Sequence, residues 1–171
     1  MTFDYIITDY ITGKPVRNMG SEASRQIFER FLIHEKGYSK KDIRVDEKLV
    51  VQFKGEDYVS AIDLIVSCND KALMAITCVA GSIGSYEREI LAGARLVYDY
   101  QIPFAVSTDA RDAMVMDTLS GKKTGQGLGA IPSKKEALEL IETMEYKPFD
   151  KTRKEREMII YRSFNLEKIN I

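Results

Sequence analysis

Histidine and cysteine are scarce in this chain of 171 residues, which has one histidine, His34, and two cysteines, Cys68 and Cys78. A structural zinc site takes several Cys or His ligands, and the sequence has no Cys-x-x-Cys spacing. In the strands expected below, the two cysteines lie about six positions apart, roughly 20 Å. A disulfide needs Cα atoms within ~7 Å, so we expect two free, buried thiols, a partly exposed His34, and a reducing, cytoplasmic compartment.

Long apolar runs and an excess of positive charge are also missing. No stretch approaches the ~20 apolar residues of a membrane span, and the N-terminus lacks a basic region followed by an apolar run. The 25 basic and 26 acidic residues give a net charge of −1, so no global positive field indicates nucleic acid. We expect no membrane contact, and DNA would need a local patch. The local basic clusters comprise Lys122, Lys123, Lys134, Lys135, Lys151, Arg153, Lys154 and Arg156.

What the chain does have is enough apolar content for one folded domain, since 44% of its residues are hydrophobic. We expect a single domain over 1–171, made of an N-terminal arm at 1–20, a core at 21–120, and a C-terminal loop and helices at 121–171. The turn signal Thr12-Gly13-Lys14-Pro15 predicts a short hairpin in the arm.

Hydrophobic periodicity predicts a mixed α/β sheet flanked by helices. A helix should begin after Ser21 and end at Gly37, with a buried stripe of Ile27, Phe28, Phe31 and Leu32. The other expected helices span 85–100, 133–144 and about 150–163. The expected strands are 43–53, 62–68, 72–79, 103–107 and an edge strand at 113–116, followed by a polar loop at 120–127. Strands 72–79 and 103–107, joined through a helix, should be parallel.

One acid, Asp63, lies inside the apolar strand 62–68. A buried carboxylate is costly unless a metal, a cation or a hydrogen-bond donor partners it. If the loop at Asn69–Lys71 holds three residues, Asp63 lies opposite Thr77. Asp63 is therefore either a functional or vestigial site residue, or a structural acid paired locally with Thr77.

The order of these elements resembles the N-terminal nuclease domain of the restriction subunit of type I restriction enzymes, in the PD-(D/E)XK superfamily. The resemblance covers roughly residues 20–120. It is carried by Glu22-Ala-Ser-Arg25-Gln26, Gly37-Tyr38, Ile43-Arg-Val, Ala61-Ile-Asp63-Leu-Ile-Val, Met74-Ala-Ile-Thr77-Cys-Val79-Ala and Gln101-Ile-Pro-Phe-Ala-Val. It implies a restriction-endonuclease-like fold with a mixed central sheet.

The resemblance also implies which residues would form the site. Asp63 and Glu22 would correspond to metal-site carboxylates, whereas the acid and lysine of the Glu-x-Lys element fall on Thr77 and Val79. This departure predicts a degenerate active site. A first-turn carboxylate such as Glu22 is also what the helix dipole favours by itself.

The segment after strand 72–79 offers replacements for the lost ligands. Gly81-Ser82-Ile-Gly-Ser85 leaves backbone N–H groups at a helix N-terminus, a geometry that can hold an anion. We name Ser82, Ser85, Arg88 and Arg25 as candidate anion- or nucleic-acid-binding residues. Helix capping explains Ser85 equally well.

Three function classes follow. The first is a non-catalytic nuclease-fold domain that binds DNA, another nucleic acid or a protein partner, and needs no cofactor. The second is a Mg²⁺-dependent endonuclease with migrated ligands, Glu22, Asp63 and either Glu87 or Glu89, and with Arg88 or Lys71 in the lysine's role. The third is an anion- or small-ligand-binding domain. We favour the first, because a single carboxylate on the strands supplies too few oxygen ligands for Mg²⁺.

Overall fold

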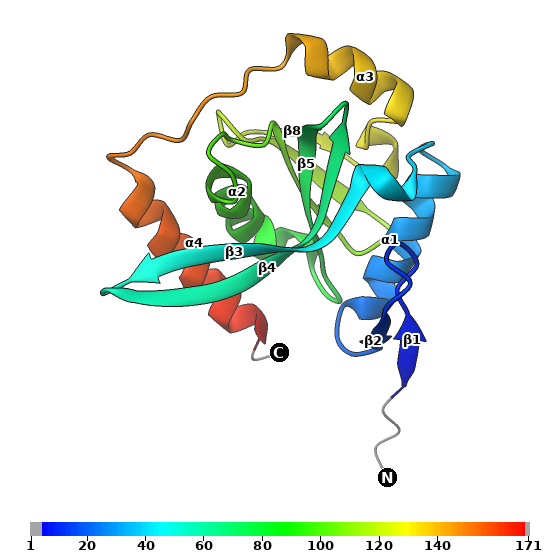
Figure 1. Ribbon diagram of the computed structural model, residues 1–171, viewed down its shortest axis with the longest axis horizontal. Helices are drawn as coiled ribbons and strands as arrows, with labels where there is room; N and C mark the ends of the chain where they lie inside the picture. Colours follow the sequence, from blue (N-terminus) through cyan, green and yellow to red (C-terminus); the bar gives the residue numbers. More distant parts are fainter. Residues whose placement is uncertain (1–4, 170–171) are drawn as a thin grey trace.

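The centre of the computed structural model, which describes residues 5–169, is a six-stranded mixed sheet with helices on both faces (Figure 1). The sheet order is β3-β4-β5-β6-β7-β8; β5 and β6 run parallel, and the other neighbouring strands run antiparallel. The strands are β3 (Ile43–Phe53), β4 (Glu56–Cys68), β5 (Lys71–Cys78), β6 (Phe104–Thr108), β7 (Ala113–Asp117) and β8 (Lys123–Gln126). The predicted mixed sheet flanked by helices is confirmed.

The helices divide between the two faces of the sheet. They are α1 (Glu22–His34), α2 (Glu87–Leu96), α3 (Lys134–Thr143) and α4 (Lys154–Ile169), with short 3₁₀ turns η1 (Lys40–Asp42), η2 (Ile83–Tyr86) and η3 (Leu128–Ala130). Because side chains alternate along a strand, Leu64 faces α1 and α3 while its neighbour Ile65 faces α2 and α4. Two apolar cores result, one on each side.

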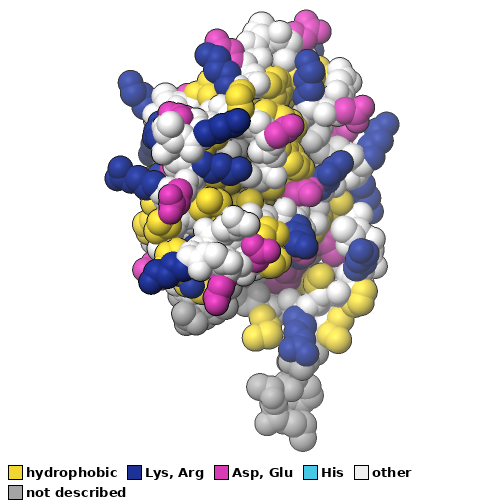
Figure 2. All heavy atoms as spheres, turned by 60° about the vertical axis from the view of Figure 1, so that its left-hand side comes forward, with side chains coloured by type: hydrophobic (Ala, Val, Ile, Leu, Met, Phe, Trp, Pro, Cys, Tyr) yellow, Lys and Arg dark blue, Asp and Glu magenta, His cyan; other side chains and the backbone are white. Residues whose placement is uncertain are grey.

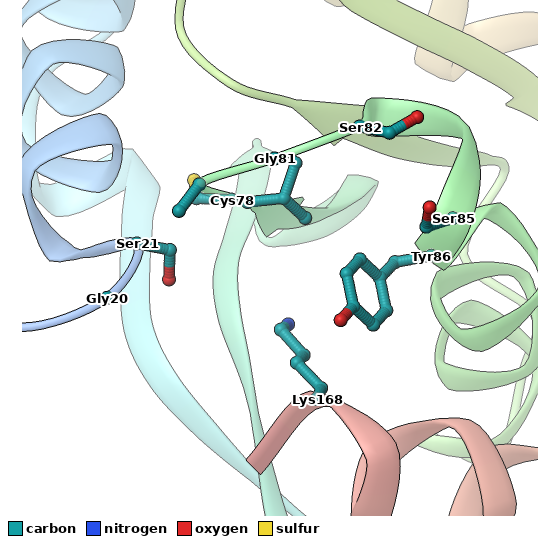
Figure 3. Close-up of a pocket in the computed structure, with 10 residues that line it drawn as sticks. Gly20, Ser21, Cys78, Gly81, Ser82, Ser85, Tyr86 and Lys168 are labelled. Atoms are coloured by element: carbon teal, nitrogen blue, oxygen red, sulfur yellow. The ribbon is translucent and has the colours of Figure 1, made fainter. Parts of the chain in front are cut away.

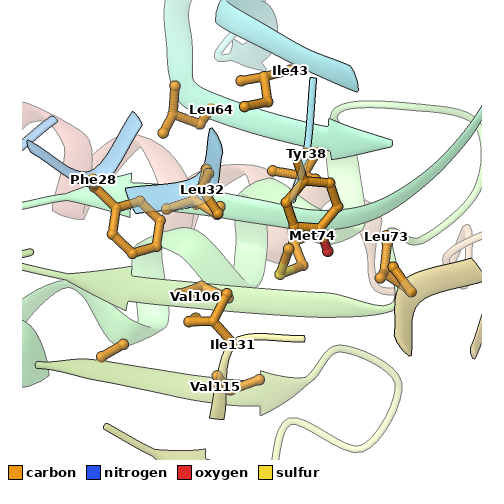
Figure 4. Close-up of a cluster of buried hydrophobic side chains, with 14 of the residues drawn as sticks. Phe28, Leu32, Tyr38, Ile43, Leu64, Leu73, Met74, Val106, Val115 and Ile131 are labelled. Atoms are coloured by element: carbon orange, nitrogen blue, oxygen red, sulfur yellow. The ribbon is translucent and has the colours of Figure 1, made fainter. Parts of the chain in front are cut away.

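The core beneath α1 and α3 is the larger of the two (Figure 4). Phe28 and Leu32 of α1 are fully buried there. They pack with strand residues, including Leu64, Val66, Leu73, Met74, Ile76, Val106 and Val115, and with Ile131, which follows η3. Fully burying a side chain of this size contributes roughly 1.5–3 kcal/mol, so this cluster holds α1 firmly beside β4 and β5.

The β4–β5 connection corrects one expectation and confirms another. Cys68 pairs with Lys71, so the turn holds two residues, Asn69 and Asp70, and not three. Both have positive φ, 50° and 61°, as the tight hairpin turns with the right twist require. A bulge at Val66/Ser67 then shifts the register by one, so that Leu64 lies opposite Ile76. The next pair outward is Asp63 and Thr77, as predicted.

The helix boundaries differ from the predicted ones by a few residues. α1 ends at His34, and Gly37, at φ 78°, lies beyond it. Ile27, expected in the buried stripe, is 56% exposed, because the side of α1 that it occupies faces away from the sheet. The expected helix 85–100 is shorter, since η2 takes the place of its first turn and α2 ends at Leu96.

The predicted edge strand and the polar loop after it are wrong in one respect. β7 is not an edge, because β8 forms inside the segment 120–127 and pairs with it. Gly125 permits this packing, since a Cβ there would come within 2.8 Å of the Ala130 Cβ. A polar, glycine-containing strand carries no hydrophobic alternation, which is why the pattern indicated a loop.

The N-terminal hairpin and the last helix are both present. β1 (Ile6–Thr8) pairs with β2 (Pro15–Arg17), apart from the main sheet. α4 extends the predicted tail helix to Ile169. The ends of the predicted arm and tail, 1–4 and 170–171, lie outside the described residues. Within the described part of the chain, no helix has the length and apolar content to cross a membrane.

Candidate active site

Asp63 lies where β4 and β5 pair, and its carboxylate is held from β5. Its Oδ2 accepts hydrogen bonds from the Cys78 backbone N–H at 2.7 Å and from Thr77 Oγ1 at 3.3 Å. Thr77 is buried, at 2% exposure, whereas about a fifth of the Asp63 side chain reaches solvent. The expected pairing with Thr77 is therefore confirmed, but it is one part of a larger set of contacts.

Lys168, in the last turn of α4, contacts both strands of this pair. Its Nζ lies 3.6 Å from Asp63 Oδ2, 3.3 Å from Glu89 Oε1 and 2.5 Å from Thr77 Oγ1. Burial opposes a charge on Lys168, but Asp63 and Glu89 more than offset it, so the pKa of the ammonium is raised. Lys168 is thus a charged group placed between two carboxylates.

Glu89 is the second carboxylate, supplied by the first turn of α2. It is buried, at 3% exposure, and its Oε2 accepts a hydrogen bond from Asn165 Nδ2 at 3.2 Å. Burial raises the pKa of Glu89, and the neighbouring Lys168 and Asn165 partly reverse the shift. Asp63 and Glu89 thus lie on either side of Lys168, a residue that sequence reasoning missed.

α4 delivers Lys168 as the last member of a polar stripe. Glu157, Tyr161, Asn165 and Lys168 recur at helical spacing, so their side chains lie on one face. Tyr161 donates a hydrogen bond to Ser60 Oγ at 2.8 Å, and Ser60 donates one to Asn165 Oδ1 at 2.9 Å. α4 packs on α2 and β3 (Figure 1), and the stripe reaches β4 through the hydrogen bonds to Ser60.

The helical spacing of these residues is visible in the sequence, but their sequence neighbours do not indicate that the side chains are buried. The tail is densely charged, and three of the four inward residues are polar enough to suggest a solvated face. Their burial depends on partners about 70–105 residues earlier in the chain, such as Arg88 and Ser60. No window of helical length contains both halves of these pairs.

Glu22 belongs to a neighbouring network at the start of α1, whose Arg25 also lies within the electrostatic reach of Asp63. Its Oε1 accepts from Arg25 Nε at 2.9 Å and from Gln26 Nε2 at 2.9 Å. Arg25 also pairs with Asp46 Oδ1 at 2.7 Å, and Asp46 adopts φ 54° in the middle of β3. By register, Asp46 lies across from Asp63, at the one position where the β3–β4 pairing is interrupted. Glu22 is therefore engaged by Arg25 and makes no direct contact with Lys168.

The residues proposed to take the lysine's role are occupied elsewhere. Arg88 makes two hydrogen bonds to the buried Glu157, at 2.6 and 2.8 Å. Lys71 lies at the opposite end of β5 from Thr77, above the Tyr146 ring. Lys168 is the cation that sits beside Asp63, so the assignment to Arg88 or Lys71 was wrong.

A cavity of about 220 Å³ opens directly above the Lys168 ammonium (Figure 3). Among its lining residues are Gly20, Ser21, Cys78, Val79, Gly81, Ser82, Ser85, Tyr86 and Lys168. Two of the predicted anion-binding residues, Ser82 and Ser85, thus border one cavity. Arg25 and Arg88 are not in its lining; both are held by carboxylates. The anion-binding interpretation stays a prediction.

The site supplies two carboxylates, Asp63 and Glu89, and both lie beside the Lys168 ammonium. Within residues 5–169, no three His, Cys, Asp or Glu side chains gather in a way that could hold a metal ion. Mg²⁺ prefers an octahedral set of oxygen ligands, whereas Asp63 and Glu89 share the positive charge of Lys168. Glu87, on the first turn of α2, has its Oε1 near Gly84 and is half-buried.

The remaining predicted groups are dispersed. Lys134 pairs with Asp42 at 2.8 Å, and Lys123 contacts Gln126. On the face shown in Figure 2, basic and acidic side chains alternate without a patch of one sign. Cys68 and Cys78 are free and buried, as expected, and His34 is exposed beside Tyr10.

Comparison with known proteins agrees with this architecture. A solved structure described as a fragment of an HsdR subunit of a type I restriction enzyme from Vibrio vulnificus YJ016 matches with a TM-score of 0.52 at 15% identity. The match covers 72% of this chain and 25% of that one, so the chain spans about a quarter of its length and shares its nuclease-like fold. No curated protein matches the chain.

The sequence itself gives the family. Residues 20–132, more than half of the chain, match the family described as Type I restriction enzyme R protein N terminus (HSDR_N). The matched segment runs from the start of the cavity wall at Gly20 to the residue before the α3 cap, and it includes Asp63, Thr77 and Glu89 but not Lys168. The chain belongs to the family of type I restriction enzyme R protein N-terminal domains.

Proposed function

We propose that this chain is a non-catalytic, nuclease-fold domain that binds nucleic acid or a partner subunit. The observation that carries the proposal is the Lys168 ammonium, which lies between Asp63 and Glu89 and contacts Thr77. Metal-assisted phosphodiester hydrolysis needs carboxylates that hold the cation and polarise the phosphate. Here the two nearest acids already balance an internal cation.

The strand positions support the same conclusion. Thr77 and Val79 replace the acid and the lysine that the PD-(D/E)XK pattern expects, and both are buried at 2% exposure. Val79 lines the cavity with an uncharged, aliphatic side chain where the pattern expects a lysine. A domain that keeps the nuclease-like fold but lacks the groups for hydrolysis can still bind nucleic acid or a partner subunit. The Vibrio vulnificus protein is described as a subunit, which supports a partner protein for this chain as well.

A cleavage assay with matched variants tests the proposal. Purified protein is incubated with single- and double-stranded DNA and with RNA, in Mg²⁺ or Mn²⁺, beside Asp63→Ala and Glu89→Ala. We expect no cleavage by any of the three proteins. Wild-type cleavage that either substitution abolishes would overturn the proposal, whereas cleavage that survives both identifies a contaminating nuclease.

Metal-dependent stability gives an independent measurement. A cation that binds only the native state raises the melting temperature by mass action. We expect 5 mM Mn²⁺ or Mg²⁺, roughly a saturating level for a working site, to leave the melting temperature of the wild type unchanged. A rise that Asp63→Asn removes would contradict the proposal.

A second candidate function is a Mg²⁺-dependent endonuclease with migrated ligands. The convergence of Asp63, Glu89 and Lys168 favours it, because two acids and one lysine are the groups of the superfamily pattern. It requires Lys168 to move away from one carboxylate. The assays above separate the two candidates, since only this one predicts cleavage and metal-dependent stabilisation of the wild type. DNA binding without cleavage, measured by fluorescence anisotropy over a salt series, would support the first.

A further inference from the structure

Glu29 is a buried acid that the candidate site does not use. It lies on α1 at 0% exposure, and in the described part of the chain no donor group reaches either carboxylate oxygen. An ionised carboxylate left dry in this way would be very costly. The group must therefore be neutral or be balanced by a neighbour.

The neighbour is Asp9, in the turn of the N-terminal hairpin. Asp9 is also buried, at 1% exposure, and it is held against the face of α1 that carries Glu29 by Arg25 and Gln26, which lie one helical turn before Glu29. Asp9 Oδ1 accepts from the backbone N–H groups of Ile11 and Thr12, at 3.0 and 2.8 Å, and Oδ2 accepts from Gln26 Nε2 at 2.9 Å. These donors favour an ionised Asp9.

Two ionised carboxylates cannot hydrogen-bond to each other, because both are acceptors. A protonated Glu29 can, by donating its O–H to an oxygen of Asp9. We propose that Glu29 and Asp9 share one proton, and that this pair is a pH-sensitive latch that fastens the N-terminal hairpin to α1. When the proton leaves to solvent hydroxide, two adjacent negative charges remain and the latch opens.

The charged groups around the pair support this arrangement. Burial, followed by the interaction with Asp9, raises the pKa of Glu29 to about 8, and Glu22 adds to the shift while Arg25 opposes it. Arg25 lies 3.7 Å from Asp9 and is itself shared with Glu22 and Asp46. From β5, the buried Cys78 thiol contributes no charge, since burial raises its pKa further.

The latch is coupled to the cavity through the segment that joins the hairpin to α1. Gly20 and Ser21, which line the cavity, join β2 to α1. Tyr10 N–H also donates to Gln26 Oε1 at 2.8 Å, and Tyr10 contacts His34 at 2.8 Å, so the hairpin has further contacts with α1. Opening the Asp9–Glu29 contact loosens the hairpin and with it this wall of the cavity.

Hydrogen exchange of the hairpin amides tests the latch. The Ile11 and Thr12 amides are compared in wild type and Glu29→Gln at pH 6.5 and pH 9, because Gln stays neutral and can still donate to Asp9. At pH 9 we expect wild-type protection to be at least about tenfold lower than that of the variant, the scale of one pKa unit. At pH 6.5 the two should agree.

Two control variants isolate the effect. Glu35→Gln changes an exposed glutamate just beyond the same helix and should behave as the wild type. His34→Gln removes a second titratable side chain that contacts the hairpin, through Tyr10. Equal protection in wild type and Glu29→Gln at both pH values would overturn the proposal. If Glu29→Gln does not fold, the carboxyl ¹³C shift of Glu29 in the wild type decides: titration together with the exposed glutamates overturns the latch, and titration several units higher supports it.

Discussion

Two clusters of buried acids flank the same pair of strands, and they are neutralised in different ways. Beside β4 and β5, Asp63 and Glu89 share the ammonium of Lys168. Beneath α1, Glu29 has no cation of its own and keeps a proton instead. The difference follows from which element packs over each acid: α4 brings a flexible lysine to the first cluster, whereas the hairpin brings a second carboxylate, Asp9, to the other.

The comparison shows two ways in which one fold can balance neighbouring carboxylates, with an ammonium or with a proton. Both clusters contain enough carboxylates to attract a cation, yet each is already balanced within the fold. Removing the internal cation or the proton should change the stability of the protein, by an amount that shows how much each cluster depends on it. The following predictions are ordered by the size of the expected effect on stability.

Lys168→Met should have the largest effect. It leaves Asp63 and Glu89 facing each other without a cation, and breaking a buried ion pair costs about 3 kcal/mol, the low end of the usual range because Lys168 is partly exposed. Urea unfolding measures the loss, with Lys135→Met, an exposed lysine on α3, as the control. The variant, unlike the wild type, should gain stability from Mn²⁺. A loss below about 1 kcal/mol, the range of an exposed pair, would show that Lys168 does not balance the acids.

Glu29→Gln should stabilise the protein, by an amount that grows with pH. The pKa of Glu29 is raised to about 8 from an ordinary 4.5, so the folded state binds more protons than the unfolded state within that window. Stability of the wild type therefore falls as pH rises through the window, by at most about 1.4 kcal/mol per unit, and levels off above it. At pH 6, about 1.5 pH units above the ordinary pKa of 4.5, the variant should be about 2 kcal/mol more stable.

The measurement for Glu29 is urea unfolding at several pH values. Glu35→Gln serves as the matched control and should track the wild type at each pH. A difference between Glu29→Gln and the wild type that is constant from pH 5 to pH 9 would show that Glu29 is ionised throughout.

Asp63→Asn should cost about 1–2 kcal/mol, the scale of a perturbed buried hydrogen bond. The amide keeps the shape of the side chain and can still accept from the Cys78 N–H, but it loses the charge that faces Lys168. Thermal unfolding with and without Mg²⁺ measures the change. A much larger loss, or one that depends on metal, would indicate that Asp63 is a ligand.

Asp46→Gly should have the smallest effect. A non-glycine residue at φ 54° costs about 1 kcal/mol, which glycine relieves. The lost pair with Arg25 offsets that gain, and the Asp46 side chain is 57% exposed, so the pair is worth at most about 1 kcal/mol. Asp46→Ala loses the ion pair with Arg25 but keeps the backbone strain at positive φ, so it should be less stable than Asp46→Gly. Equal stabilities of the two variants would show that the backbone at Asp46 carries no strain.

The sequence by itself determined the elements and the strand pairing around Asp63. Two apolar runs joined by a short turn predicted that β4 and β5 lie side by side. The family motifs predicted the fold, with Thr77 and Val79 where the acid and the lysine would be. These features are local, because hydrophobic periodicity and turn chemistry act over a few residues. Even the two-residue turn and its compensating bulge left Asp63 opposite Thr77.

The tertiary structure alone decided how the acids are neutralised. Lys168 meets Asp63 across more than a hundred positions of sequence, and Asp9 meets Glu29 only because the hairpin folds back onto α1. Whether a carboxylate keeps its charge depends on burial and on the partner within a few ångströms. Those quantities arise when helices pack on the sheet, and no local pattern of residues encodes them.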